Sequence, residues 1–173
     1  MKGSNVRLRA VEPGDVDFIL QIENDPLAWQ AGNTVVPFSR FQIEQYVLTT
    51  QHNIFADKQL RLMIDTIRQS PVRTIGCIDL FDFDPIHKRA GIGIIITEEE
   101  RGKGYAAESL GLLIRYCTEI LMLHQLYCNI SPDNARSLRL FKKHGFVRCG
   151  IKKDWRFKEG KWTDEIMFQR INK

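Results

Sequence analysis

The turn Arg101-Gly102-Lys103-Gly104 is the part of the chain whose residue types point most directly to chemistry. It follows the run Ile92–Ile96, β-branched except for Gly93, and precedes a stretch of helical periodicity. A helix that starts at a glycine turn directs unpaired backbone N–H groups and the positive end of its dipole toward one point. The turn therefore predicts an anion site, usually for phosphate, to which Arg101 and Lys103 add charge. An ordinary strand-to-helix turn has the same glycines, so both interpretations stay open.

Cysteine and histidine, the residues of most zinc sites and disulfides, are scattered along the chain. The four cysteines form no Cys-x-x-Cys pair, and the four histidines show no ligand spacing. This distribution predicts no metal site and no disulfide. We expect reduced, mostly buried thiols.

Composition and length limit the classes of partner that the chain is expected to bind. The chain has 173 residues, 43% hydrophobic and 27% charged, which is ordinary for one globular domain over residues 1–173. The net charge is +4, but lysine and arginine are spread along the chain, so we expect no nucleic-acid partner. The N-terminus has no apolar signal segment, and no apolar run approaches the roughly 20 residues of a membrane span. We therefore expect a cytoplasmic protein without a membrane partner.

Hydrophobic periodicity and turn residues place the elements around the glycine turn. A capping-box pattern at Ser39 and Gln42 predicts a helix that runs to about Gln51. The expected strands are Val6–Val11, Leu60–Asp65, Thr74–Phe83, the run ending at Thr97, His124–Ile130, Val147–Phe157 and Lys161–Arg170. The other expected helices begin after Pro13, at the glycine turn and after Asn134.

The connections between these elements predict the fold class. Strands two to four are joined too closely for crossovers and should form an antiparallel meander, whereas strands four and five are joined through a helix and should be parallel. The expected class is α/β (mixed α+β), with a mixed, mostly antiparallel central sheet flanked by helices. Trp29 and Phe38 lie in the irregular segment 24–38 and fit either a lid on the core or a wall of a substrate pocket.

Two motifs in this order resemble the GNAT superfamily of acetyl-CoA-dependent N-acetyltransferases. The first is Arg101, Gly104 and Ala106 after a strand that ends at Thr97, and the second is the segment Asn134–Phe146. The resemblance covers almost the whole chain and implies the acyl-CoA N-acyltransferase fold, with strands four and five splayed. It also implies that amides of the first motif hold the CoA pyrophosphate and that the preceding strand pairs with the pantetheine arm. The cofactor-binding residues that it implies are Ile94, Ile95, Ile96, Thr97, Arg101, Gly102, Lys103, Gly104, Tyr105, Ala106, Asn134, Ser137 and Phe141.

Within the superfamily the chain is most similar to acetyltransferases of ribosomal-protein N-termini and to bacterial spermidine acetyltransferases. Spermidine-type enzymes have a tyrosine that protonates the CoA thiolate seven residues after the helix asparagine, where this chain has Phe141. Phenylalanine cannot donate a proton. Ser137, one helical turn earlier, is a candidate to hydrogen-bond the sulfur, although a helix serine also bonds its own backbone or the pantetheine.

The resemblance implies direct attack of an amine on the thioester, which requires a base, and an oxyanion donor such as a backbone N–H near Ile95. Asp79 lies in the apolar part of strand three, and burial raises the pKa of a carboxylate toward that of a useful base. A solvent-facing Asp79 fits the pattern equally well. Glu23, Trp29 and Asp82 are the candidate residues for binding the amine.

The expected function is therefore transfer of an acetyl group from acetyl-CoA to a primary amine, such as a polyamine or a protein N-terminus. The alternative is a catalytically weak or inactive CoA-binding regulatory module, which Phe141 favours. A nucleotide-phosphate site is less favoured, because no Walker-type Lys-Ser/Thr pair follows Gly104. The sequence does not identify the acceptor or the oligomeric state, and a homo-oligomer stays open.

Overall fold

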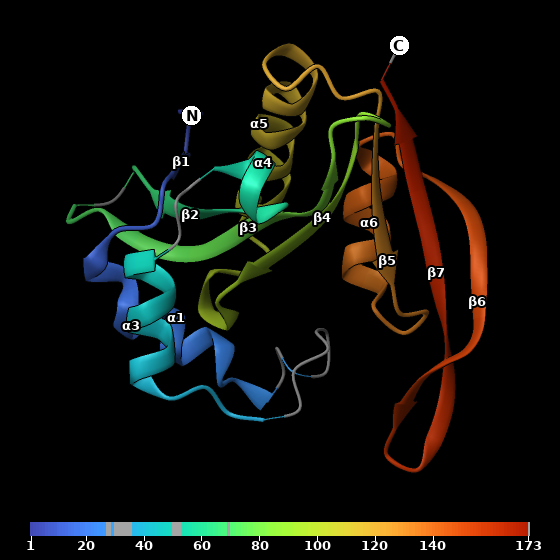
Figure 1. The fold of residues 1–173 in the computed structure, drawn as a ribbon, viewed down its shortest axis with the longest axis horizontal. Coiled ribbons are helices and arrows are strands. Elements are labelled where there is room, and N and C mark those ends of the chain that lie inside the picture. The colour runs from blue at the N-terminus through green and yellow to red at the C-terminus, as the bar shows by residue number, and fades with distance from the viewer. Residues whose placement is uncertain (27–28, 30–35, 50–52, 69, 173) are drawn as a thin grey trace.

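A seven-stranded sheet in the order β1-β2-β3-β4-β5-β7-β6 forms the centre of the molecule (Figure 1). The structure, a computed structural model, describes residues 1–173 except 27–28, 30–35, 50–52, 69 and 173. The strands are β1 (Val6–Arg9), β2 (Leu60–Thr66), β3 (Arg73–Asp84), β4 (Arg89–Ile96), β5 (Gln125–Ile130), β6 (Val147–Lys158) and β7 (Lys161–Ile171). The helices are α1 (Val16–Glu23), α3 (Arg40–Thr49), α4 (Ile54–Asp57), α5 (Tyr105–Glu119) and α6 (Ala135–Lys143), with 3-10 helices η1 (Pro13–Asp15) and η2 (Glu98–Glu100). In this part of the chain no helix has the length and apolar character needed to cross a membrane.

The predicted order of the main elements is confirmed, and the capping box is present. The Ser39 N–H donates to Gln42 Oε1 at 2.8 Å, and the Gln42 N–H donates to Ser39 Oγ at 3.2 Å. The predicted end of this helix near Gln51 lies outside the described residues. Helix α4 was not predicted, because a single turn is too short to show helical periodicity; Asn53 caps it by accepting from the Phe55 N–H at 3.0 Å.

The two faces of the sheet carry separate cores, because successive side chains of a strand point to opposite faces. Met63, Cys77 and Ile95 pack with α1 and α3 on one face. Ile64 and Ile78 belong to the larger core on the other face, which α5 and α6 cover (Figure 1). This arrangement leaves the middle strands β3 and β4 buried from both sides.

Strands β4 and β5 are parallel, as predicted, but they pair only briefly. Among the described residues, their register comprises Arg89 with Gln125, Ala90 with Leu126 and Gly91 with Tyr127. On its other edge β4 pairs with β3 as far as Ile96. The strands therefore separate after Gly91, which confirms the splayed sheet of the expected fold.

The ring of Phe81 lies at the point where β4 and β5 part. A Cβ atom at Gly91 would lie 2.2 Å from Cε2 of Phe81, so only glycine leaves room for the ring. The ring also packs edge-to-face on Tyr127 of β5, with centroids 5.8 Å apart. At Gly93, two residues along the same face, the nearest described atom to such a Cβ would be Phe81 Cε1 at 4.0 Å.

The two glycines of β4 provide a matched test of this packing. Gly91→Ala should lower the free energy of unfolding by about 1–3 kcal/mol, because the added methyl group must displace the Phe81 ring. Gly93→Ala should change it by less than about 0.5 kcal/mol. Urea unfolding of both variants measures the difference, and equal losses would contradict the role of Gly91.

Candidate active site

The edge of β4 beyond Gly91 presents backbone groups to the gap between the strands. The Thr97 N–H donates to the Ile75 carbonyl of β3 at 2.9 Å, and in an antiparallel pair the direction of the backbone groups alternates along the strand. The N–H of Ile95 therefore points toward β3, whereas those of Ile94 and Ile96 point toward the gap. The predicted oxyanion donor near Ile95 is thus best provided by one of these two neighbours.

The side chains of this segment are used for packing. Ile94 and Ile96 pack in the larger core, and Ile95 packs on the opposite face with the α1 and α3 core. A ligand in the gap would therefore contact the backbone of the predicted cofactor-binding residues Ile94–Thr97 more readily than their side chains.

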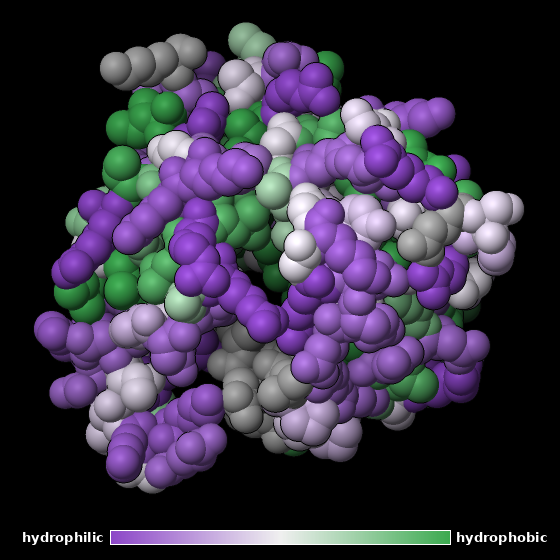
Figure 2. All heavy atoms as spheres, turned by 180° about the vertical axis from the view of Figure 1, so that it is seen from behind, coloured by the Kyte–Doolittle hydropathy of each residue, from purple (hydrophilic) through white to green (hydrophobic). Residues whose placement is uncertain are grey.

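The predicted anion site lies at the end of this gap. Gly102 and Gly104 adopt left-handed conformations, with φ of 80° and 86°, and Gly104 is the N-cap of α5. Tyr105 and Ala106 form the first turn of α5 and pack on the larger core, which fixes the helix end. The first N–H groups of a helix have no acceptor within it, so they are available to an anion. Figure 2 shows the molecule from behind, with a hollow near its centre that hydrophilic side chains border.

The two basic side chains of the turn are directed toward the protein. Arg101 Nε donates to the Ile96 carbonyl at 3.0 Å. Lys103 Nζ donates to Glu100 Oε2 at 2.9 Å. Both basic side chains thus bind groups of the protein itself, whereas the sequence suggested that they point at the anion.

Helix α6 places its predicted residues in three different settings. Asn134 is the N-cap, and its Oδ1 accepts from the Ser137 N–H at 3.0 Å. Ser137 itself is half-buried. Phe141, one turn later on the same face, is 3% exposed and packs edge-to-face on Phe146 with ring centroids 5.0 Å apart. The structure therefore gives Phe141 a core position.

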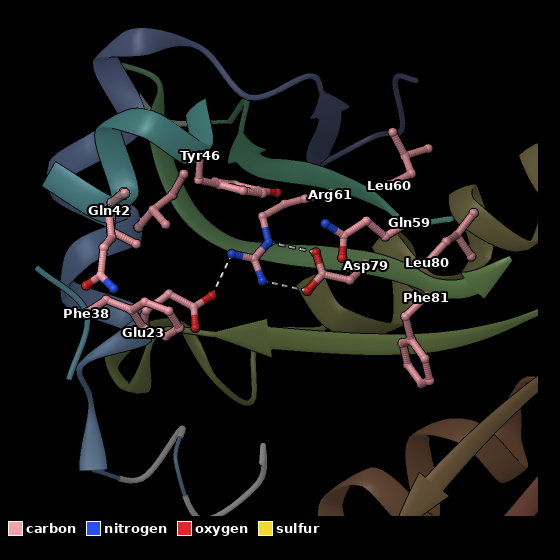
Figure 3. A pocket seen from close by; sticks show the side chains of 12 residues that line it. Glu23, Phe38, Gln42, Tyr46, Gln59, Leu60, Arg61, Asp79, Leu80 and Phe81 are labelled. Carbon is pink, nitrogen blue, oxygen red and sulfur yellow. Dashed lines mark hydrogen bonds and ion pairs between the residues drawn. The ribbon is translucent and has the colours of Figure 1, made fainter. Parts of the chain in front are cut away.

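A pocket between α1, α3 and the sheet holds two carboxylates bridged by one guanidinium (Figure 3). Arg61 of β2 donates to both oxygens of Asp79, with Nε–Oδ1 of 2.9 Å and Nη2–Oδ2 of 3.0 Å. Its Nη1 lies 2.5 Å from Glu23 Oε1. The pocket has a volume of about 330 Å³, and its other lining includes Ile19, Phe38, Ile43, Tyr46, Leu60 and Phe81.

This charged group is largely removed from solvent. The side chains of Arg61, Glu23 and Asp79 are only 18%, 20% and 25% exposed. Desolvation lowers the pKa of Arg61, but the charge of Asp79 leads the effects that raise it well above its usual value. The guanidinium therefore stays charged, and the pocket carries one negative charge in excess.

The β4 neighbour of Asp79 is a glycine. Asp79 lies directly opposite Gly93 in the β3–β4 register. Because Gly93 has no side chain, nothing of that residue stands between the carboxylate and the β4 backbone. Asp79 and the β4 backbone are therefore direct neighbours across the β3–β4 pair.

Two other predicted substrate residues lie elsewhere. Asp82 is exposed and accepts from the Tyr127 hydroxyl at 2.8 Å, next to the last β4–β5 pair. Burial, and then this bond, raise the pKa of Tyr127. Trp29 Nε1 donates to the Glu23 carbonyl at 2.5 Å, but among the described residues neither Trp29 nor Asp82 lines the pocket.

Arg61 and Glu100 are site residues that the sequence analysis missed. An available signal was Arg61 between Leu60 and Leu62, since an arginine in an apolar strand needs a buried acid such as Asp79 in a neighbouring strand. Within the described ranges no three His, Cys, Asp or Glu side chains gather as a metal site.

Comparison with known proteins identifies the family of this chain. The family model described as "Acetyltransferase (GNAT) domain" matches residues 5–147. The chain belongs to the GNAT acetyltransferase family.

Similar proteins include acetyltransferases of two kinds. Spermidine N(1)-acetyltransferase of Vibrio cholerae is 29% identical over 161 residues, which cover 93% of this chain and 90% of that protein. The [Ribosomal protein uS5]-alanine N-acetyltransferase of Escherichia coli is 33% identical over 76 residues, 44% of this chain and 39% of that protein. A crystal structure of the V. cholerae enzyme in complex with CoA and spermine matches with a TM-score of 0.84 and 27% identity, over 98% of this chain and 96% of that one.

The bridging arginine should be important for stability. Arg61→Met leaves Glu23 and Asp79 facing each other and should lower the free energy of unfolding by about 2–3 kcal/mol, somewhat less than for fully buried pairs. Arg40→Met removes an exposed arginine paired with Asp17 and Glu44 and should cost less than about 1 kcal/mol. Denaturant unfolding of the two variants compares them, and an Arg61 variant as stable as the wild type would contradict the bridge.

Proposed function

We propose that the protein transfers the acetyl group of acetyl-CoA to a primary amine. The observation that carries the proposal is the gap along β4, which has an anion site at one end and the Glu23–Arg61–Asp79 pocket beside it. A thioester with a phosphorylated tail fits the gap, and a cationic amine fits the pocket. No metal is needed for this reaction.

The donor is held mainly by the backbone in this proposal. The N–H groups at the start of α5 and in the turn Arg101–Gly104 bind the CoA pyrophosphate. The gap-facing backbone groups of Ile94 and Ile96 pair with the pantetheine arm as a further strand would. Asn134 and Ser137 border the arm from α6, with Phe141 supporting that helix from beneath.

The acceptor amine is bound and activated by the acids. The excess negative charge of the pocket attracts the ammonium form, and Asp79 receives its proton through a water molecule. Each oxygen of Asp79 bonds Arg61 but retains a lone pair for this purpose. The amine nitrogen then attacks the thioester carbonyl carbon, and an N–H of β4 stabilises the negative charge that develops on its oxygen. The carbon–sulfur bond breaks, the second proton of the attacking nitrogen passes through solvent to the departing sulfur, and the Ser137 hydroxyl hydrogen-bonds that sulfur.

A polyamine or a protein N-terminus is the proposed acceptor class. Both carry an ammonium on a chain slender enough for a pocket lined by Phe38, Tyr46 and Phe81. Spermine occupies a structure of the V. cholerae relative, and the E. coli relative acts on an alanine of a ribosomal protein. Glu23 binds the amine in this proposal, whereas Asp82 and Trp29 lie outside the residues that line the pocket. A solved V. cholerae spermidine N-acetyltransferase is dodecameric, which supports a homo-oligomer here as well.

The proposed reaction is tested by binding and turnover together. We expect millimolar CoA to raise the melting temperature, because a ligand that binds only the folded state stabilises it. Free thiol should then be released from acetyl-CoA in the presence of spermidine, spermine or N-terminal peptides and not without an amine. The absence of any thermal shift would contradict the cofactor. A shift without turnover on the whole amine panel, including aminoglycosides, would favour the CoA-binding regulatory module.

Asp79 is the second test of the proposal. Asp79→Asn should lower kcat by about 10²–10⁴-fold while CoA affinity changes little, because it removes the proton acceptor and leaves the donor site intact. Glu23→Gln is the matched control and should act mainly on the KM of the amine. If Asp79→Asn kept the wild-type kcat, Asp79 would be excluded as the base.

A further inference from the structure

The anion turn contains a buried acid of its own. The Glu100 side chain is 5% exposed and lies in η2, directly before Arg101. Its Oε2 accepts from Lys103 Nζ at 2.9 Å, and its Oε1 accepts from Arg73 Nη2 of β3 at 3.0 Å. A carboxylate is thus fixed beside a site whose proposed ligand is itself an anion.

This arrangement sets two effects against each other. The negative charge of Glu100 repels a nearby phosphate, and its bond to Lys103 withholds a cation that would attract one. The same carboxylate also holds the Lys103 ammonium close to the site. Removing Lys103 from Glu100 leaves the carboxylate paired with Arg73, so the buried charge keeps a partner during the change.

Lys103 is the more exposed of the two cations of the turn. It is 47% exposed and lies between Gly102 and Gly104, the two residues with left-handed backbone. Arg101, by contrast, is half-buried and tied to the Ile96 carbonyl. Arg73 belongs to β3, outside the turn.

We propose that Glu100 is a positioning residue that holds Lys103 in an internal ion pair, and that Lys103 exchanges Glu100 for the CoA pyrophosphate when the cofactor binds. Glu100 thereby keeps the empty turn ordered and sets the strength and salt dependence of donor binding. This inference rests on the proposed binding of CoA at the turn.

Four variants measured by calorimetric titration with CoA test the exchange. Glu100→Gln should tighten CoA binding about three- to tenfold at low salt, because one repelling charge is gone and Lys103 is released. Glu99→Gln is the matched control on the same 3-10 helix; Glu99 is exposed, so its removal should change affinity less than about twofold. Lys103→Met should weaken binding, and it should do so more strongly in the Glu100→Gln background than in the wild type.

The outcomes separate the exchange from the proposed function. A wild-type chain that binds no CoA would contradict the cofactor and the exchange together. A chain that binds CoA, but whose affinity is unchanged or weakened by Glu100→Gln, would overturn the exchange alone. An equal loss of CoA affinity on Lys103→Met in the wild-type and Glu100→Gln backgrounds would also overturn the exchange. Titration with inorganic pyrophosphate should rank the affinities of the variants in the same order, since the exchange involves only the pyrophosphate group.

Discussion

Strands β4 and β5 run side by side for three residue pairs and then separate. The separation leaves the backbone groups of Ile94 and Ile96 without a neighbouring strand on one edge, in the middle of a sheet that is buried on both faces. Polar backbone groups in such a place need a partner, and Arg101 Nε supplies one to the Ile96 carbonyl. The glycine turn and the start of α5 follow this edge in the chain, and Gly93 of the same strand pairs with Asp79 of the acid pocket. The parting of two strands thus positions both halves of the candidate site.

Paired charges on the two sides of the gap follow one physical rule. Arg61 lies between two carboxylates in the acid pocket, and Glu100 lies between two cations at the glycine turn. A buried charge is costly unless it is paired. In each group the central ion is paired on both sides, and one charge is left in excess, negative in the pocket and positive at the turn. The signs suit a cationic acceptor and an anionic donor.

Local signals predicted the fold and the elements on either side of the glycine turn. The capping box at Ser39, the glycine turn and the Asn134 cap each depend on residues a few positions apart. The Arg61–Asp79 pair joins residues 18 positions apart in neighbouring strands, and Arg73–Glu100 joins a strand to a 3-10 helix 27 positions later, so only the tertiary structure brings these partners together. The direction of the Ile94 N–H also depends on register. The position of Phe141, seven residues after Asn134, could not tell a core residue from a cofactor contact.

The short β4–β5 seam also bears on how the molecule is held together. Strands β1–β4 form one antiparallel unit and β5–β7 another, and within the described sheet three residue pairs join them. Cooperative units of this kind open with different free energies when the contacts between them are few. A pantetheine arm lying in the gap would bond to one unit and border the other, and so act as the missing strand of the sheet. In this protein the donor substrate would then be a structural element for the duration of each turnover.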